Sequence, residues 1–240
     1  MAAPFSPGAD LERLRRNPYP GRGLVLGRSE RGNSWLLLYW IMGRSPGSRA
    51  RRLVAEGGLL RTVPLESRPV PDPSLLLYEA MLELPPRFIV GNGDQTRTVF
   101  ETLRCGGRFE DALAGREREP DAPNYTPRIT GLLDLGGGTG EIALSLLRAN
   151  PLDPRLTDRF TYRPAPPPPG IGWGLTTYTG DGTPLPAFRG DPLLLPLAGE
   201  AEAVLDAYWE ALNPEHRVAL AVKEVPAGGG PSRILVRNRF

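Results

Sequence analysis

Residues 23–42 read GLVLGRSERGNSWLLLYWIM, and the fold class follows from this stretch. Two apolar runs, at 23–27 and 35–42, flank a polar segment, ERGN, at 30–33. Apolar runs joined by a short turn that contains glycine and asparagine are typical of a β-hairpin. The stretch therefore predicts two antiparallel strands joined by a tight turn.

Further strands and helices follow the hairpin in separate blocks. Apolar runs between turn residues predict strands at 59–63, 74–78, 87–90, 129–134, 141–147, 218–225 and 234–236. Apolar residues at helical spacing predict helices at 11–16, 95–103, 109–118 and 200–212. Many strands and a few helices in segregated blocks favour an α+β fold.

The 240 residues suffice for one large domain with a hydrophobic core, or for two small ones. We expect residues 1–16 to form a lead-in segment and residues 17–240 to form a single domain. Within that domain, the proline-rich residues 162–170 predict a surface linker. The three prolines within residues 120–127 predict an extended loop.

The composition argues against several classes of function. A net charge of +2 gives no strong field for nucleic acid or for an anionic membrane. Cys105 is the one cysteine and His216 the one histidine, so neither a disulfide nor a cysteine- or histidine-rich metal site is expected. The chain shows no signal-peptide pattern at its start and no apolar run of about 20 residues. We therefore expect a cytoplasmic protein without a metal.

Two segments rich in glycine and proline carry arginines that suit a phosphate group. In NPYPGRG, Arg22 lies between two glycines, where the backbone can approach a ligand closely. In YWIMGRSPGSR, a predicted strand is followed by Arg44, Ser45 and Arg49. A guanidinium group binds phosphate through two hydrogen bonds, and hydroxyl groups can bind the remaining oxygens. A plain turn is the alternative for the first segment, and a solvated loop is the alternative for the second.

Two further segments carry groups that could orient a polar substrate. In GNGDQT, Asn92 and Gln95 offer paired donors and acceptors that match an amide or a purine edge. The alternative is that this segment only caps the following helix. In EPDAPNYTPRI, Glu119 and Arg128 lie in a loop stiffened by prolines, and rigid loops suit preorganised sites.

Residues 133–141, LDLGGGTGE, resemble the first glycine motif of S-adenosylmethionine-dependent methyltransferases. That motif should follow a strand, open a helix and precede a second parallel strand that ends in an acidic residue. Residues 150–169 are rich in proline and predict no such strand. We therefore interpret residues 136–140 as the turn of a β-hairpin.

Taken together, four segments resemble the IMP cyclohydrolase family of the archaeal type and its bacterial relatives. They are NPYPGRG (17–23), YWIMGRSPGSR (39–49), GNGDQT (91–96) and EPDAPNYTPRI (119–129), and their order and spacing match as well. TTYTGDGTPLPAF from Thr176 and YWEALN from Tyr208 resemble the longer bacterial members. The resemblance spans most of the chain and depends on the whole set of motifs.

The resemblance implies a four-layer αββα sandwich like that of N-terminal-nucleophile hydrolases, without their terminal nucleophile. It implies an IMP cyclohydrolase of purine biosynthesis that needs no cofactor. Such an enzyme interconverts 5-formamido-1-(5-phosphoribosyl)imidazole-4-carboxamide, the formamido nucleotide, with inosine monophosphate (IMP) and water. The expected partner is therefore a small-molecule nucleotide, and a homo-oligomer is compatible with the sequence.

By resemblance, Tyr78 would donate a proton or hydrogen bond to the formyl oxygen, and Glu119 would be the general base. Arg128 would steady Glu119 or the oxyanion, and Lys223 is a further catalytic candidate. An ordinary buried tyrosine is an equally good reading of Tyr78. The implied substrate-binding residues are Arg22, Arg44, Ser45, Arg49, Asn92, Gln95 and Thr96.

Two other functions remain as alternatives. A purine-nucleotide-binding protein of the same fold would keep the phosphate-binding arginines and show no turnover. A methyltransferase would bind S-adenosylmethionine at the glycine run.

Overall fold

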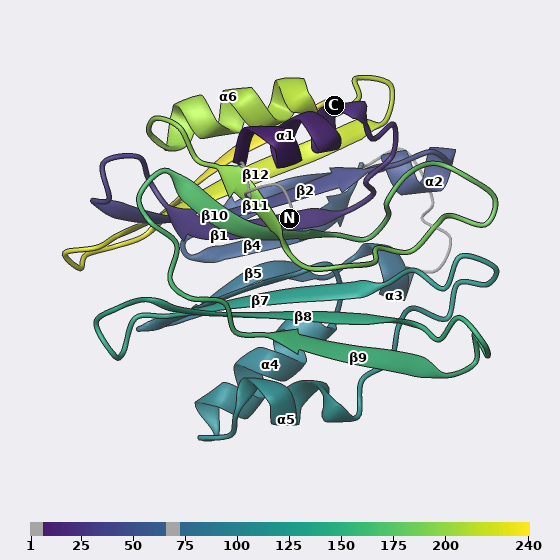
Figure 1. Cartoon of the computed structure of the whole chain (residues 1–240), viewed down its shortest axis with the longest axis horizontal. Helices are drawn as coiled ribbons and strands as arrows, with labels where there is room; N and C mark the ends of the chain where they lie inside the picture. Colours follow the sequence, from purple (N-terminus) through teal and green to yellow (C-terminus); the bar gives the residue numbers. More distant parts are fainter. Residues whose placement is uncertain (1–6, 66–72) are drawn as a thin grey trace, which may run out of the picture.

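The computed structural model describes residues 7–65 and 73–240. Two antiparallel β-sheets face each other, and helices cover both outer sides (Figure 1). The order of layers is therefore helix, sheet, sheet, helix. This arrangement confirms the α+β class that the sequence predicts.

The first sheet has six strands in the order β11-β10-β1-β2-β12-β13. Their bounds are β11 (Leu193–Pro196), β10 (Ile171–Thr176), β1 (Gly23–Arg28), β2 (Ser34–Met42), β12 (Arg217–Pro226) and β13 (Arg233–Asn238). The predicted hairpin at 23–42 is confirmed, because β1 and β2 pair with Gly23 opposite Trp40 and Arg28 opposite Trp35.

The second sheet is a meander in which each of seven strands pairs with the next one along the chain. Its strands are β3 (Arg51–Glu56), β4 (Leu59–Pro64), β5 (Glu79–Leu84), β6 (Arg87–Gly91), β7 (Arg128–Asp134), β8 (Glu141–Ala149) and β9 (Thr157–Tyr162). Each pairing in this sheet joins strands that follow one another along the chain, with the longest connection, residues 92–127, between β6 and β7. The first sheet instead gathers strands from distant parts of the chain.

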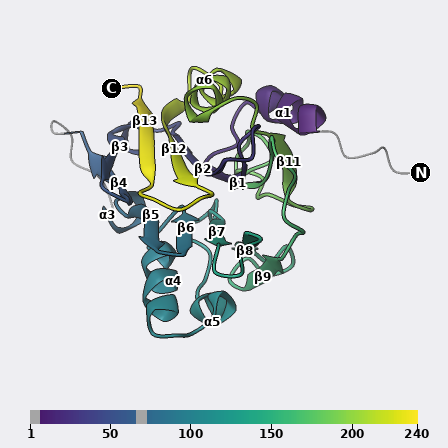
Figure 2. The same ribbon diagram turned by 90° about the vertical axis from the view of Figure 1, so that its left-hand side faces the viewer.

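The helices divide between the two outer faces (Figure 2). The first sheet is covered by α1 (Pro7–Arg16) and α6 (Ala201–Ala211), and the second by α4 (Gln95–Arg104) and α5 (Phe109–Ala114). Two short helices, α2 (Pro46–Arg49) and α3 (Pro73–Leu76), lie together at one end of the sandwich. No helix in the described part of the chain is long and apolar enough to cross a membrane.

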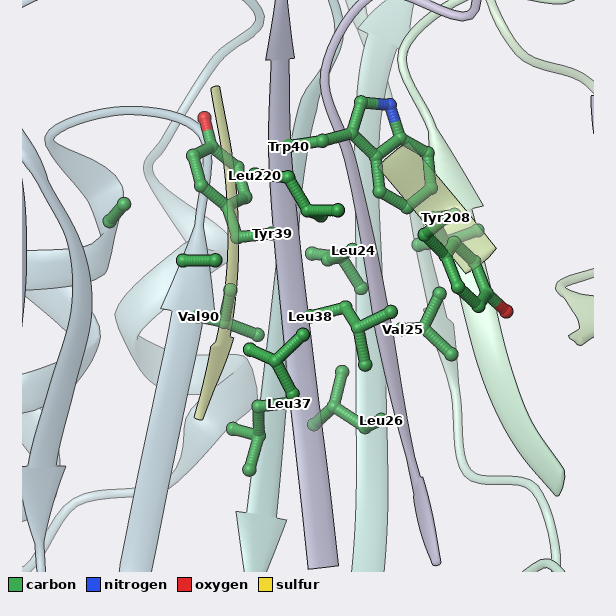
Figure 3. Packing of buried hydrophobic residues seen from close by; sticks show 14 of the residues in the cluster. Leu24, Val25, Leu26, Leu37, Leu38, Tyr39, Trp40, Val90, Tyr208 and Leu220 are labelled. Atoms are coloured by element: carbon green, nitrogen blue, oxygen red, sulfur yellow. The ribbon is translucent and has the colours of Figure 1, made fainter. Parts of the chain in front are cut away.

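The core explains why β2 is an uninterrupted apolar run. All nine residues of β2 are buried, because α6 covers one face of the strand and the second sheet covers the other. Trp40 packs against Tyr208 of α6 with 6.2 Å between ring centroids. Tyr39 points to the opposite side, where Val90 of β6 lies (Figure 3). A strand covered on both faces has no polar alternation.

Most of the predicted elements are found, and one is wrong. The strand predicted at 74–78 does not form, since α3 spans Pro73–Leu76 and β5 begins at Glu79. A proline at the first position of a helical turn has the backbone angle that the turn needs, and it favours α3 over a strand. The helix predicted at 109–118 ends earlier, at Ala114, with Gly115 as its C-cap.

The predicted lead-in is partly helical, and its helix belongs to the folded body. α1 packs on β11, with Leu14 buried, and Asp10 accepts a hydrogen bond from the Leu194 amide at 2.8 Å. Residues 1–6 lie outside the described part. The predicted linker at 162–170 connects β9 to β10, and the predicted loop at 120–127 connects α5 to β7.

Candidate active site

A pocket of about 330 Å³ lies at the end of the sandwich where α2 and α3 are found. It is lined by residues within the segments 19–22, 42–51, 75–76, 119–126 and 178–185. The segments come from both sheets and from the loop before β7. The volume lies within the usual range for small-molecule sites, about 300–1,000 Å³.

One end of the pocket holds a buried ion pair. Arg22 Nη2 lies 3.0 Å from Glu119 Oε2, and the two residues are only 7% and 3% exposed. Burial raises the pKa of the Glu119 carboxyl above its ordinary value, and the charge of Arg22 opposes this without cancelling it. Burial lowers the pKa of Arg22, but the charge of Glu119 and the neighbouring tyrosines together raise it, and the net pKa lies well above its ordinary value. Arg22 is therefore a permanent cation.

Backbone geometry fixes the position of Arg22. Gly21 has a φ of +72°, which favours glycine. A Cβ atom on Gly21 would lie 2.2 Å from Thr177 Oγ1 and 2.5 Å from the ring of Tyr178. The Arg22 amide donates to Thr177 Oγ1 at 3.1 Å, and the Thr177 amide donates to the Arg22 carbonyl at 2.8 Å. The start of β1 is thus held against the end of β10.

The other end of the pocket is basic and rich in hydroxyl groups. Arg44, Ser45, Ser48 and Arg51 all line it. The guanidinium of Arg44 lies 5.1 Å from the ring centroid of Tyr19. Arg44 also pairs with Asp181 and donates to the Gly182 carbonyl at 3.1 Å.

Arg51 is a site residue that the sequence reasoning missed. It is 3% exposed, and it donates from Nε to the Ser48 carbonyl at 3.1 Å and from Nη1 to the Leu76 carbonyl at 3.4 Å. Among the described residues no carboxylate pairs with Arg51. A buried guanidinium that carbonyl groups alone hold, as far as the described residues show, favours an anionic ligand nearby.

Arg49 lies outside this pocket, although the sequence predicts it as a phosphate ligand. Its Nε donates to the Gly43 carbonyl at 2.8 Å, and its Nη2 lies 3.1 Å from Nδ1 of His216. Arg51 therefore lines the pocket, whereas the predicted Arg49 does not.

A chain of three hydrogen-bonded side chains forms part of the wall of the pocket. The hydroxyl of Thr126 donates to Asp121, and the Thr126 amide donates to Asp121 Oδ1 at 2.6 Å. The hydroxyl oxygens of Thr126 and Tyr178 are 2.5 Å apart. Tyr178 stacks on Tyr19 with 5.9 Å between ring centroids.

A sequence profile described as IMP cyclohydrolase-like protein matches residues 19–229. The chain belongs to this family. The matched range contains the ion pair, the basic end and the wall of the pocket. A search of curated proteins gives no match.

Other family motifs lie around the pocket at different depths. The hydroxyl of Tyr78 is 2.5 Å from that of Tyr39, and both tyrosines are buried. Burial and the neighbouring Tyr78 raise the pKa of Tyr39 well above 10.0. Tyr78 does not line the first pocket; it borders a second hollow of about 340 Å³ together with Thr62 and Glu79.

Most of the GNGDQT motif of this IMP cyclohydrolase-like chain lies beneath the surface, whereas Asp94 is exposed. Asn92, Gln95 and Thr96 are fully buried. Asn92 accepts from the Ile129 amide at 2.8 Å and from Gln95 Nε2 at 2.9 Å, so these amides tie α4 to β7. Thr96 donates to the Gly93 carbonyl at 2.9 Å. The three side chains are engaged within the protein and are not among those that line the first pocket.

Arg128 links this layer to the ion pair. It donates to Gln95 Oε1 at 2.8 Å and pairs with Asp94 Oδ1 at 2.7 Å. Its buried Nε has no hydrogen-bond partner among the described residues. The charge of Arg128 lowers the pKa of Glu119, which places the two groups within electrostatic range. The role of steadying Glu119 stays a prediction.

The remaining candidates fall outside the pocket. Lys223 pairs with Glu83 and donates to the Gly58 carbonyl at 2.7 Å. On the paired strands it lies opposite Leu37, whereas Met42 of the pocket wall lies opposite Arg217. Lys223 is six positions along β12 from Arg217, which corresponds to roughly 20 Å of strand. Within residues 7–65 and 73–240, no group of three His, Cys, Asp or Glu side chains could hold a metal.

The glycine run forms the turn that the sequence predicts. β7 and β8 pair in antiparallel register, with Asp134 opposite Glu141. The run therefore connects two neighbouring strands of a hairpin, and no helix follows it. The strand–helix context of a methyltransferase motif is absent from this segment.

Proposed function

We propose that the protein is an IMP cyclohydrolase that interconverts the formamido nucleotide with IMP and water. Membership of the IMP cyclohydrolase-like family supports the reaction class. The observation that carries the proposal is the pocket with a buried Arg22–Glu119 pair at one end and arginines with hydroxyl groups at the other. A nucleotide has a reacting base that suits the ion pair and a phosphate that suits the arginines and hydroxyl groups.

In this proposal the 5′-phosphate binds at the basic end. Arg44 and Arg51 supply guanidinium groups, while Ser45 and Ser48 supply hydroxyl groups. Arg44 would exchange its bond to Asp181 for bonds to the phosphate. Hydrogen bonds to charged groups contribute about 1.5–3 kcal/mol each, so two arginines can account for a strong preference for nucleotide over nucleoside.

The chemistry takes place at the ion pair. The carboxamide nitrogen attacks the formyl carbon of the same molecule, which gives a tetrahedral carbinolamine. Glu119 accepts the proton that the nitrogen loses, and Arg22 stabilises the negative charge that develops on the formyl oxygen. Glu119 returns this proton to the formyl oxygen, which becomes a hydroxyl group. Transfer of the proton from the former formamide nitrogen to that hydroxyl group then releases water and leaves the C=N bond of IMP. The predicted donation from Tyr78 to the formyl oxygen is not part of this proposal, because Tyr78 does not line the pocket.

Because the reacting groups belong to one molecule, the protein must supply less of the rate acceleration. An attacking group held against its target in the same molecule can have an effective molarity of ~10⁵ M or more. The residues therefore need only to hold the formyl group toward the amide, stabilise charge and move protons. This chemistry requires no electrophilic metal.

The proposal is tested by incubating purified protein with the formamido nucleotide and following IMP formation by absorbance. We expect turnover that is absent from a protein-free control. The second candidate, a purine-nucleotide-binding protein without turnover, is favoured by the fact that Glu119 is already engaged with Arg22. Tight IMP binding without ring closure would support that candidate and contradict the first.

The two facing sheets between helical layers support a fold like that of N-terminal-nucleophile hydrolases, with the chemistry moved to internal side chains. A cytoplasmic location is in keeping with the single cysteine, Cys105, which cannot form an intramolecular disulfide.

A further inference from the structure

The hydroxyl of Tyr178 ends a hydrogen-bond chain that the proposed chemistry does not use. Both oxygens of Asp121 accept hydrogen bonds from Thr126, one from its amide and one from its hydroxyl. A threonine hydroxyl has a single proton, and Asp121 engages it. The proton in the 2.5 Å contact between Thr126 and Tyr178 must therefore come from Tyr178.

This order of donors determines what Tyr178 can offer to a ligand. A phenol has one proton, and here that proton points to Thr126, so the free lone pair of the oxygen is an acceptor. Burial raises the pKa of Tyr178 above its ordinary 10.0 although the charge of Arg22 acts in the opposite sense. The proton therefore stays on the phenol at neutral pH.

Tyr178 lines the pocket and is linked to both of its charged groups. On one side its ring stacks on Tyr19, and Tyr19 in turn contacts the guanidinium of Arg44 at the basic end. On the other side its neighbour Thr177 holds the backbone of Arg22, whose side chain forms the ion pair. The ribose of a nucleotide also lies between the phosphate and the base.

We propose that Tyr178 accepts a hydrogen bond from a ribose hydroxyl of the bound nucleotide, with Thr126 and Asp121 as positioning residues. The identity of the ligand rests on the proposed function. An acceptor that is left without its donor on ligand binding is unfavourable. The pocket should therefore prefer a ribonucleotide over the deoxy analogue that lacks the contacting hydroxyl.

The test compares dissociation constants for IMP, 2′-deoxy-IMP and 3′-deoxy-IMP by calorimetry. Wild type should bind IMP about 3- to 10-fold more tightly than one of the two analogues, the value of one neutral hydrogen bond. Tyr178→Phe should remove this preference, and Thr126→Val should reduce it. Thr126→Ser keeps the hydroxyl group and should retain the preference.

The outcomes separate this inference from the proposed function. If wild type binds IMP and Tyr178→Phe keeps the full preference, the ribose contact is overturned while the proposed function stands. If wild type does not bind IMP, the proposed function and the ribose contact both fail.

A second measurement tests whether Tyr178 donates its proton to Thr126. A donated proton should give a slowly exchanging Tyr178 hydroxyl resonance in ligand-free protein. That resonance should be present in wild type and Thr126→Ser and lost in Thr126→Val; its absence from wild type would overturn the donor chain.

Discussion

At the scale of single residues, the function depends on which arginines face the pocket. Arg49 and Arg51 are two positions apart, yet one binds the Gly43 carbonyl beside His216 and the other lines the pocket. The motif YWIMGRSPGSR ends at Arg49, so resemblance selects that residue. Arg51 belongs to β3, whose first residues alternate between buried and exposed. Recognising β3 as a strand would have indicated that Arg51 points inward.

Arg51→Gln should weaken IMP binding about 10- to 100-fold, because a buried guanidinium loses its charged hydrogen bonds to the phosphate. Inosine, which has no phosphate, should bind the variant and the wild type about equally. Arg49→Gln is the matched control and should change IMP affinity little. Calorimetric titration of both ligands provides the measurement, and an equal loss for IMP and inosine would show that Arg51 is only structural.

The pKa of Glu119 provides a second prediction at this scale. Burial raises it above the ordinary 4.5, and the charge of Arg22 lowers it. Removing that charge in Arg22→Gln should therefore raise the pKa of Glu119 further. A ¹³C NMR titration of the Glu119 carboxyl, assigned with Glu119→Gln, measures both values. A pKa that falls in Arg22→Gln would contradict the direct pairing of the two residues.

At the scale of elements, the β7–β8 hairpin distinguishes two readings of the glycine run. A Cβ on Gly140 would lie 2.0 Å from the Trp35 ring, and φ there is +76°. Gly140→Ala should therefore lower the free energy of unfolding by about 2–4 kcal/mol through strain and overpacking. Gly137 has only Glu141 within 4 Å of an added Cβ, at 3.9 Å, and Gly137→Ala should be near neutral.

Urea unfolding measures both glycine variants. Equal effects of the two substitutions would contradict the hairpin geometry, and S-adenosylmethionine binding that Gly137→Ala abolishes would restore the methyltransferase reading.

The elements that the sequence predicts correctly have an unambiguous pattern, and those it misses do not. The hairpin of β1 and β2 is apolar on both sides of a clear turn. β10 reads IGWGLT, and its glycines resemble turn residues, although Gly172 and Gly174 lie against side chains of β1 and β11. β9 is polar and partly exposed at a sheet edge, and β11 has only four residues. Long-range pairing defines these strands, and no local pattern reveals it.

At the scale of the whole molecule, one part of the sandwich holds the pocket and another part contains contacts that join the two sheets. Lys223 of β12 reaches Glu83 of β5 and the carbonyl of Gly58, so it joins the two sheets far from the pocket. The sequence suggested Lys223 as a further catalytic candidate, but the strand register separates it from the ion pair. The candidate site as a whole could be predicted only as a set of motifs, because five separate segments of the chain meet there.

Lys223→Met should lower the free energy of unfolding by about 1–3 kcal/mol, since Glu83 and the Gly58 carbonyl lose their donor. It should leave kcat for ring closure within about twofold of wild type, because roughly 20 Å of strand separate the lysine from Arg217, which lies opposite Met42 of the pocket wall. Urea unfolding and the absorbance assay give the two values. A large loss of kcat with unchanged stability would place Lys223 in the chemistry after all.

The central claim is that the buried Arg22–Glu119 pair performs the proton transfer of ring closure. The most direct measurement is the turnover of Glu119→Gln together with its affinity for IMP. The variant keeps the shape of the side chain and an oxygen that can accept from Arg22, so IMP should still bind with little change. Its kcat should fall by ~10²–10⁴, the usual contribution of a general base. A kcat close to that of wild type would contradict the account.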